Sequence, residues 1–339
     1  MANATPSHLG IQNNASHTAW SSASYADKNA LFLKVFSNEI LATFNAATVL
    51  KERTRVRTIT AGKSASFAAI GKTVAEYHVP GTELLGNNFL QDEVVVTIDD
   101  MLIAHTFISN YEDAKNHYDV RAEFSTQMGQ ALAQTYDRNL FGLAGSKAMT
   151  PSSSGIADQG VAERINLDTD QAGAGNTTTN TTNDIIDGLY LAKQKFDEKN
   201  VQGEINCFVS PKVYYALVQN DKVLNRDFLT SGNGDYANAN ILKVAGMPII
   251  MTNNMAVNHG ASASTAKYPD FQSKYGTDMT SMLALCMHKE ALGTVQLMGL
   301  VTESSYDIRR QGELAVARMA CGHGIIREEG IIGVTGTFA

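Results

Sequence analysis

Charged residues are scarce in this chain of 339 residues, because Asp, Glu, Lys and Arg make up only 18 % of it while hydrophobic residues make up 44 %. The formal net charge of −7 argues against a protein whose main task is to neutralise nucleic-acid phosphates, which requires a basic surface. The composition suits a subunit whose faces are buried by copies of itself, and it would also suit an ordinary α+β enzyme. The length allows more than one compact unit with a core of its own.

Cysteine and long apolar runs are scarce as well. The three cysteines, Cys207, Cys286 and Cys321, are far apart and form no CxxC pair, which predicts buried free thiols in a reducing compartment instead of a disulfide or a metal site. No apolar run approaches the roughly eighteen residues of a membrane span, and no basic-then-apolar signal follows Met1. We therefore expect that the chain is made in the cytoplasm and does not associate with a membrane.

Motifs of catalytic or cofactor chemistry are missing too. Residues 62–64 could end a phosphate-binding loop, but Arg57 stands where the first glycine is required, and the segment continues into a predicted strand. Asp168 and Asp170 resemble part of a calcium loop, but Ala172 stands at a ligand position. The eight histidines are dispersed, whereas a zinc site needs about four converging ligands. We expect no catalytic, cofactor-binding or metal-binding residues and no cofactor; a catalytic site assembled from distant residues is the alternative.

The most informative positive feature is a helical pattern over residues 109–142. Ser109 and Glu112 form a capping-box pattern. Apolar residues then recur at every fourth position: Val120, Phe124, Met128, Leu132, Tyr136 and Leu140. The pattern predicts one long helix with these residues in the core, and the stripe winds round the axis because steps of four overshoot the helical repeat. A shorter helix that restarts with Asp119 as its cap is the alternative.

Two predicted strands, 56–72 and 93–108, flank a segment rich in turn residues, including Pro80 and Gly81. This arrangement predicts a long β-hairpin. Because a single two-stranded ribbon is marginally stable in water, we expect it to lie on another surface.

Opposite charges gather on the two sides of this hairpin. Residues 28–72 hold eight basic and two acidic residues, a net charge of +6, and residues 92–123 hold eight acidic and two basic residues, a net charge of −6. The simpler interpretation is that both segments form solvated faces, where each exposed ion pair stabilises the fold by at most about 1 kcal/mol. The alternative is contact between neighbouring subunits. The candidate intersubunit residues are Arg53, Arg55 and Arg57, predicted on one side of an extended strand, with Lys63, Lys72, Asp99 and Glu112.

The rest of the chain predicts an arm, a loop region and an α/β unit. Residues 1–29 lack periodicity and precede a short amphipathic helix from Leu31 to Phe44. Residues 146–182 predict a loop with one short strand near Ile165. Asn183 is expected to cap a helix that ends at Lys199. Further elements are expected as strands at 205–209, 241–251, 282–288 and 293–300, a helix from Pro211, and strands within 306–339 that return to pack on the long helix.

Residues 112–121, with the sequence EDAKNHYDVR, resemble the segment that enters the spine helix in major capsid proteins of short-tailed, T-seven-type tailed phages. The resemblance continues, in the family's order, at residues 30–44, 56–73, 96–104, 287–297 and 322–330. It implies the Hong Kong 97-type capsid fold, which is of the α+β class. The implied parts are an N-terminal arm (1–55), an extended β-hairpin loop (56–108), a peripheral domain with the spine helix (109–182), an axial α/β domain (183–300) and returning peripheral strands (301–339).

This resemblance implies a structural major capsid protein and not an enzyme. The expected assembly is an icosahedral phage shell of pentamers and hexamers that encloses double-stranded DNA without reading its sequence. The expected partners are further copies of the chain, a scaffolding protein, a portal protein and, in some shells, a decoration or cement protein. The expected location is the virion, after assembly in the host cytoplasm. An encapsulin-like compartment is the first alternative, and a soluble nucleotide-binding enzyme built on residues 183–300 is an alternative of another class.

Overall fold

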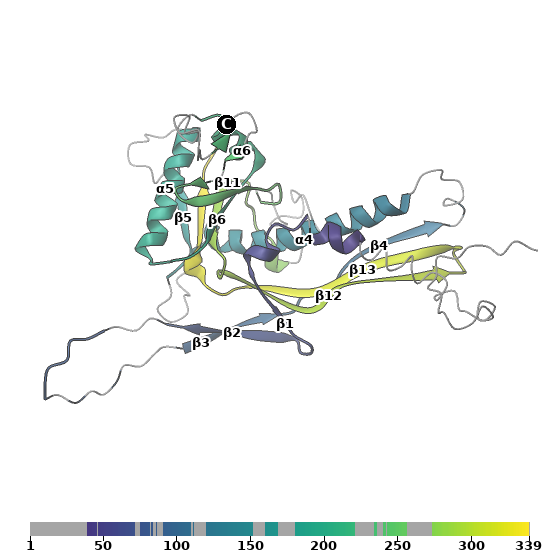
Figure 1. Cartoon of the computed structure of the whole chain (residues 1–339), viewed down its shortest axis with the longest axis horizontal. Coiled ribbons are helices and arrows are strands. Elements are labelled where there is room, and N and C mark those ends of the chain that lie inside the picture. The colour runs from purple at the N-terminus through teal and green to yellow at the C-terminus, as the bar shows by residue number, and fades with distance from the viewer. Residues whose placement is uncertain are drawn as a thin grey trace, which may run out of the picture. The chain divides into compact units, whose positions relative to one another are not determined.

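The computed structural model describes residues 39–338, with gaps at 46, 72–74, 82, 84–85, 87–90, 110, 112–119, 152–159, 169–179, 221–233, 236–239, 242 and 256–272. Contacts divide the chain into two compact units. Unit 1 consists of Met1–Thr48, Asp100–Tyr136 and Met298–Cys321, and unit 2 consists of Val49–Asp99, Asp137–Leu297 and Gly322–Ala339. The helix α4 (Val120–Met149) and the strands β12 (Leu292–Asp307) and β13 (Gly312–Ile325) contribute residues to both units (Figure 1).

The core of unit 2 is a mixed six-stranded sheet. In spatial order its strands are β5 (Glu163–Asn166), β14 (Ile331–Thr335), β11 (Met282–His288), β6 (Ile205–Val209), β10 (Met247–Met251) and β9 (Lys243–Val244). The pairs β10–β6 and β14–β5 are parallel, and the remaining pairs are antiparallel. All residues of β6 and β14 are buried, as is typical of strands that are covered on both faces.

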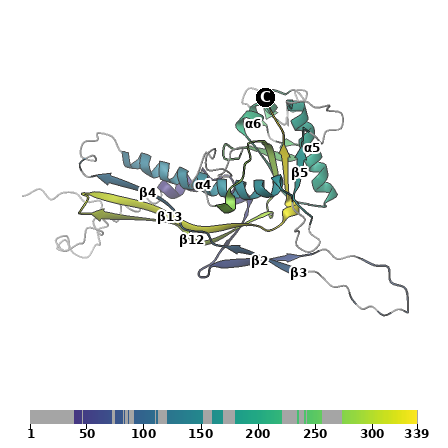
Figure 2. The same ribbon diagram turned by 180° about the vertical axis from the view of Figure 1, so that it is seen from behind.

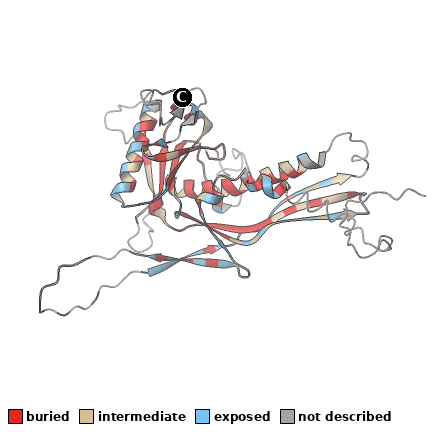
Figure 3. Ribbon diagram, viewed as in Figure 1, coloured by how far each residue is buried: buried red, intermediate tan, exposed pale blue. Residues whose placement is uncertain are grey.

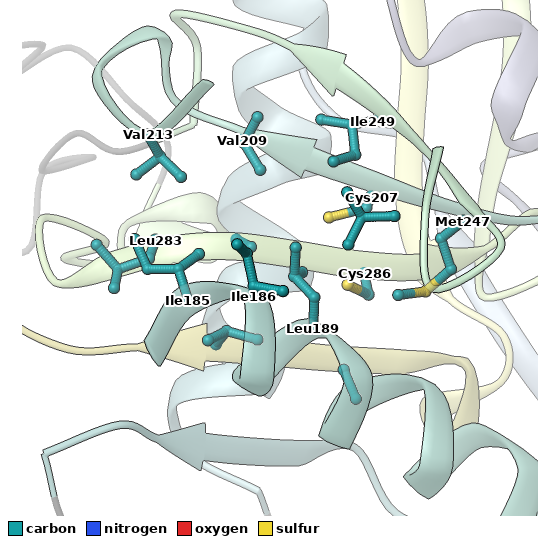
Figure 4. Close-up of a cluster of buried hydrophobic side chains, with 14 of the residues drawn as sticks. Ile185, Ile186, Leu189, Cys207, Val209, Val213, Met247, Ile249, Leu283 and Cys286 are labelled. Atoms are coloured by element: carbon teal, nitrogen blue, oxygen red, sulfur yellow. The ribbon is translucent and has the colours of Figure 1, made fainter. Parts of the chain in front are cut away.

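Helices α5 (Thr182–Glu198) and α6 (Pro211–Val218) contribute apolar side chains to one cluster with the strands, shown in Figure 4. Cys207 and Val209 of β6 belong to this cluster. The ring of Phe208, between them, meets the ring of Phe141 of α4 edge to face, with centroids 5.3 Å apart. Because successive side chains of a strand alternate between faces, the C-terminal part of α4 covers the face opposite the cluster.

Several elements of unit 2 confirm the predicted ones, and two differ. The bounds of β6 and β11 are as predicted, Ile165 lies in β5, and Pro211 opens α6. The cap of α5 is Thr181 and not Asn183, because the Thr181 backbone N–H donates to Asp184 Oδ2 over 2.7 Å. The strand predicted over 241–251 is interrupted by a turn at Ala245 and Gly246, whose φ angles are 51° and 78°.

Unit 1 is built from the antiparallel pair of β4 (Leu102–Ser109) and β13 together with the N-terminal half of α4. Residues 39–45 are helical and pack on α4. The carbonyl oxygen of Ile40 would lie 2.9 Å from a Cβ placed on Gly129, so glycine is required for this close approach. The hydroxyl of Ser125 donates to Glu39 Oε2 over 2.9 Å, which fixes the same contact.

The long helix is displaced from its predicted range. Ser109 is the last residue of β4, so it does not cap the helix with Glu112, which lies outside the described residues. Helix α4 begins at Val120, in agreement with the alternative boundary at Asp119, a residue also outside the described ones. It continues beyond 142 to Met149 because its last turns are packed, as the red colour in Figure 3 shows.

The predicted hairpin is shorter than expected. Strands β2 (Ser64–Ile70) and β3 (Gln91–Thr97) form an antiparallel two-stranded sheet, called here the ribbon (Figure 2). The strand predicted over 56–72 divides at Gly62, whose φ of 116° reverses the chain, so that β1 (Arg55–Thr58) pairs with β12 instead. The strand predicted over 93–108 divides in the same way, because β4 pairs with β13. The resulting four-stranded sheet has the order β1-β12-β13-β4.

Candidate intersubunit interface

One face of the ribbon is anchored in unit 2. Ala65 and Phe67 of β2 and Val96 of β3 are buried against two residues from elsewhere in the chain, Val295 and Ile326. Strand β2 alternates strictly between exposed and buried residues, which is the pattern of a sheet with one packed face. The ribbon therefore shares a small hydrophobic core with Val295 and Ile326.

The opposite face of the ribbon is exposed and partly apolar. Ile70 is 58 % exposed and Val95 is 53 % exposed. Beyond the paired strands, Tyr77 is fully exposed and Val79 is 64 % exposed. These exposed apolar side chains make this part of the chain a candidate contact surface.

The three candidate arginines do not share one strand face. Arg53 lies in a 3-10 turn, Lys51–Arg53, and its guanidinium donates to the Val49 carbonyl oxygen over 2.8 Å. Only Arg55 and Arg57 lie in β1, and both are exposed. The prediction of a single arginine face is therefore wrong, because Arg53 lies in the turn and the extended backbone begins only at Thr54, its C-cap.

Both exposed arginines lie against the ribbon. The Arg57 guanidinium donates to the Ser66 carbonyl oxygen over 2.6 Å, and the Arg55 guanidinium lies 5.6 Å from the centre of the Phe67 ring. Lys63 is exposed immediately before β2. Lys72 lies outside the described residues.

The two candidate acidic residues are Asp99 and Glu112, and Asp99 is less exposed than the basic candidates of β1. Asp99 has a side chain only 13 % exposed, and it forms an ion pair with Lys274 over 3.1 Å. It also accepts a hydrogen bond from the Tyr275 hydroxyl. Asp99 is therefore engaged within its own chain. Glu112 lies outside the described residues.

The residues proposed for the core of the long helix lie in α4. Met128, Leu132 and Tyr136 are buried and Phe124 is half-buried, while the side chain of Val120 lies outside the described ones. The Tyr136 ring meets the Phe44 ring edge to face, with centroids 6.0 Å apart. These contacts join α4 to the helical segment at residues 39–45.

Sequence reasoning missed a buried carboxylate on the same helix. Asp137 is fully buried and accepts the backbone N–H of Val49 over 2.8 Å and that of Leu50 over 3.2 Å. Burial raises the pKa of Asp137 to about 6, against the two hydrogen bonds and the charge of Arg53, which lower it. The signal in the sequence was an aspartate within the apolar pattern of the helix. Burying a carboxylate is costly unless hydrogen bonds or an opposite charge compensate it, so such a residue has a structural role.

The sequence alone did not identify the surroundings of His323. Its ring is buried, its Nδ1 lies 3.0 Å from the Thr294 hydroxyl, and its backbone N–H donates to the Tyr275 hydroxyl. Burial and then the charge of Lys274 lower the pKa of His323 to about 3. The imidazole is therefore neutral and structural.

Little in the described residues supports catalysis or metal binding. Within that part of the chain no three His, Cys, Asp or Glu side chains are grouped to hold a metal ion. A cavity of about 540 Å³ lies beside Ser210, Thr252 and Phe338, and its lining holds one charged side chain, Lys212, with no histidine, cysteine or acid. Lys212 Nζ donates to the Phe338 carbonyl oxygen over 3.1 Å. The one charged group in the lining is therefore engaged with a backbone carbonyl oxygen.

The cysteines are free and buried, as predicted. The neighbouring Cys286 thiol and burial raise the pKa of Cys207 well above its ordinary value, which keeps this thiol protonated and unreactive. Among the helices in the described ranges, none combines the length and the apolar character that crossing a bilayer requires.

Comparisons with known proteins match the chain to capsid proteins of phages. Residues 66–334 match the family model described as "Gp10A-like: Major capsid protein". The chain is 30 % identical to the major capsid protein of Escherichia phage T7 over 321 residues, which cover 89 % of this chain and 91 % of the relative. It is also 30 % identical to the major capsid protein of Enterobacteria phage T3 over 323 residues, which cover 90 % and 91 %.

Solved capsids share the fold. The capsid protein of the cyanophage P-SCSP1u superposes with a TM-score of 0.72 and 35 % sequence identity over the whole of both chains. The mature capsid of bacteriophage PhiM1 superposes with a TM-score of 0.66 and 18 % identity, covering 86 % of this chain and 87 % of that one. The predicted α+β, Hong Kong 97-type capsid fold is confirmed. The chain belongs to the Gp10A-like family of phage major capsid proteins.

Proposed function

We propose that this chain is the wall-forming subunit of an icosahedral phage shell that encloses double-stranded DNA, and that it assembles as pentamers and hexamers. The observation that carries the proposal is the ribbon. One of its faces is anchored in unit 2 and the other leaves Ile70 and Val95 exposed, while Tyr77 and Val79 are exposed in the segment between the two strands. A monomeric enzyme gains nothing from such a surface, whereas a shell subunit covers it with a neighbour.

The proposed division of labour follows the order of the chain. Residues 1–55 act as an arm, 56–108 as the intersubunit hairpin, 109–182 and 301–339 as the peripheral domain, and 183–300 as the axial domain. Arg55, Arg57 and Lys63 remain candidate contacts because they are exposed. Each contact can be weak, because many copies make the shell stable together and let misplaced subunits leave during assembly.

Further partners follow from the proposed role. The subunit would assemble in the host cytoplasm with a scaffolding protein and a portal protein, and some shells would add a decoration or cement protein. The formal charge of −7 fits a wall that confines DNA without binding it, since sequence-independent binding requires basic contacts to phosphates.

Electron micrographs of the purified full-length chain test the function. Closed shells of uniform size support it, whereas isolated globular particles would favour the nucleotide-binding enzyme. The absorbance spectrum of particles released from infected host cells separates a phage shell from an encapsulin-like compartment, because a DNA-filled shell shows a nucleic-acid spectrum and a compartment filled with enzymes does not.

A further inference from the structure

Two of the three buried cysteines lie directly opposite each other on neighbouring strands. The register of the antiparallel pair β11 and β6 places Cys286 opposite Cys207. Residues directly opposite each other in such a pair project from the same face of the sheet. Both side chains belong to the hydrophobic cluster on that face, where Figure 4 labels them, and both are 0 % exposed. The two thiols therefore face each other inside the core of unit 2.

The spacing of the two strands fits a disulfide bond. Opposite residues in an antiparallel pair have Cα atoms about 4.5 or 5.5 Å apart, depending on their place in the hydrogen-bond pattern. A disulfide joins residues whose Cα atoms are about 4.4 to 6.8 Å apart, so both spacings lie in the allowed range. The thiols are also in contact, because a hydrogen bond with the Cys286 side chain, followed by burial, raises the pKa of Cys207. The folded strands therefore hold the two sulfur atoms where a bond between them can form.

The pair occupies the middle of the six-stranded sheet. Strands β14 and β5 lie on one side of β11, and strands β10 and β9 lie on the other side of β6. A covalent bond between β11 and β6 would therefore join the two halves of the sheet. The residues between the two cysteines include α6, β9 and β10, so the bond would close a long loop of the chain. Closing a long loop restricts the unfolded state strongly, and the bond would stabilise unit 2.

We propose that Cys207 and Cys286 form a latent disulfide site, whose thiols stay reduced where the chain is made and join in an oxidising environment. A major capsid protein meets such an environment in the released virion, where disulfides persist. The bond forms within one chain and links its two central strands. The proposal is therefore independent of how the subunits pack in a shell.

The oxidant is a low-molecular-weight disulfide, and the reaction is thiol–disulfide exchange. One cysteine, as its thiolate, attacks a sulfur atom of the small disulfide, and the first small thiol leaves. The second cysteine, as its thiolate, attacks the protein sulfur of this mixed disulfide, and the second small thiol leaves. The protein loses two electrons and two protons, which the two released thiols carry away.

Burial makes this reaction slow and its product durable. The thiolate is the attacking form, and the raised pKa of Cys207 keeps its thiol protonated while the strands are closed. Exchange therefore requires a local opening of the sheet, which native proteins undergo as part of their normal fluctuation. After the strands have closed again, the same burial excludes reducing thiols. A bond formed outside the cell therefore persists.

Peptide mapping of the purified full-length chain tests the site. The chain is incubated with an excess of 2-hydroxyethyl disulfide, in buffer and in urea below the unfolding midpoint, and the remaining thiols are blocked with iodoacetamide. Trypsin then releases Cys207 in residues 200–212 and Cys286 in residues 275–289. We expect mass spectrometry to find these two peptides linked in most chains, with a mass two hydrogens below their sum. The peptide that contains Cys321 should not be linked to either of them.

Single substitutions assign the link and measure its effect. Cys207→Ala and Cys286→Ala should each abolish the linked peptide, whereas the matched control Cys321→Ala, at the third buried cysteine, should retain it. Oxidation should raise the midpoint of thermal unfolding by roughly 5 °C in the wild type and in Cys321→Ala, and by nothing in the other two variants. Each variant is compared with itself, reduced and oxidised, so that any destabilisation by the substitution cancels.

The outcomes separate a disulfide site from simple packing of two small side chains. Absence of the linked peptide both in buffer and in urea would overturn the proposal. A linked peptide with an unchanged or lowered midpoint would overturn it as well, because the bond would then not fit the folded sheet. A link through Cys321 or between two chains would do the same. None of these measurements depends on shell formation, so a failure of the capsid function would be seen separately.

Discussion

At the scale of single residues, two buried titratable groups respond to acid in opposite directions. The Asp137 carboxyl has a raised pKa and the His323 imidazole has a lowered one. A group whose pKa differs between the folded and unfolded states makes stability depend on pH. The effect of burying each side chain can therefore be tested by measuring how the folding stability depends on pH.

His323 should make the fold sensitive to acid. Its pKa is about 3 in the fold and 6.5 in the unfolded chain, so acidification protonates the unfolded state first. The neutral imidazole contributes fully to the free energy of unfolding above about pH 6.5. This contribution is lost as the pH falls toward 3, and at about pH 4.5 the loss is roughly 2 to 3 kcal/mol. We expect His323→Asn to flatten this loss in urea unfolding of the dissociated subunit across pH. An unchanged slope would contradict the buried, neutral imidazole.

Asp137 should act in the other direction. Its pKa is about 6 in the fold and 3.8 in the unfolded chain, so the fold takes up the proton first. Protonation of Asp137 therefore stabilises the folded state relative to the unfolded state. This stabilisation, of up to roughly 3 kcal/mol, is complete below about pH 3.8 and is lost as the pH rises through about 6. Asp137→Asn should therefore make stability fall more steeply on acidification, whereas the exposed control Asp187→Asn should leave the slope of the wild type.

At the scale of elements, α4 shows why a regular sequence pattern predicted a helix but not its ends. The apolar residues at every fourth position predicted the helix itself, and Met128, Leu132 and Tyr136 are buried as expected. The last turns hold Gly142, Ala144 and Ala148, which are small and carry little periodic signal, yet they are buried. Tertiary packing sets this end of the helix, and a single sequence does not contain that information.

The helix core should respond to truncation in proportion to burial. Leu132 is 2 % exposed, so Leu132→Ala should destabilise the dissociated subunit by about 2 to 5 kcal/mol. Phe124 is half-buried, so Phe124→Ala should cost less, and the exposed Gln127→Ala should stay within roughly 0.5 kcal/mol. Chemical unfolding measures all three. Equal losses for Leu132 and Gln127 would place Leu132 outside the core.

Pairing between strands also escaped sequence analysis where it joins distant segments. The alternation of β2 and β3 predicted a hairpin, but nothing in residues 55–58 indicated that β1 pairs with β12, more than 200 residues away. The same holds for the Asp99–Lys274 ion pair. Candidate contacts chosen by charge alone therefore included a residue that is used within the chain.

At the scale of the whole molecule, the ribbon should separate folding from assembly. Replacing residues 71–90 by a short turn keeps β2, β3 and their packing on Val295 and Ile326 but removes the exposed residues Tyr77 and Val79. We expect a folded subunit with nearly wild-type thermal stability that forms no closed shells in electron micrographs. Normal shells from this variant would show that the outer part of the ribbon is not an intersubunit element.

The position of β14 has a consequence for synthesis of the chain. This strand, Ile331–Thr335, lies between β5 and β11 in the six-stranded sheet, and its partners in β5 are more than 160 residues earlier. While the ribosome is still translating, at about 5 to 20 residues per second, β5 and β11 each have an unpaired edge for several seconds after they emerge. Such edges pair readily with other nascent chains, so a chaperone that shields this gap on polysomes would raise the yield of native subunits.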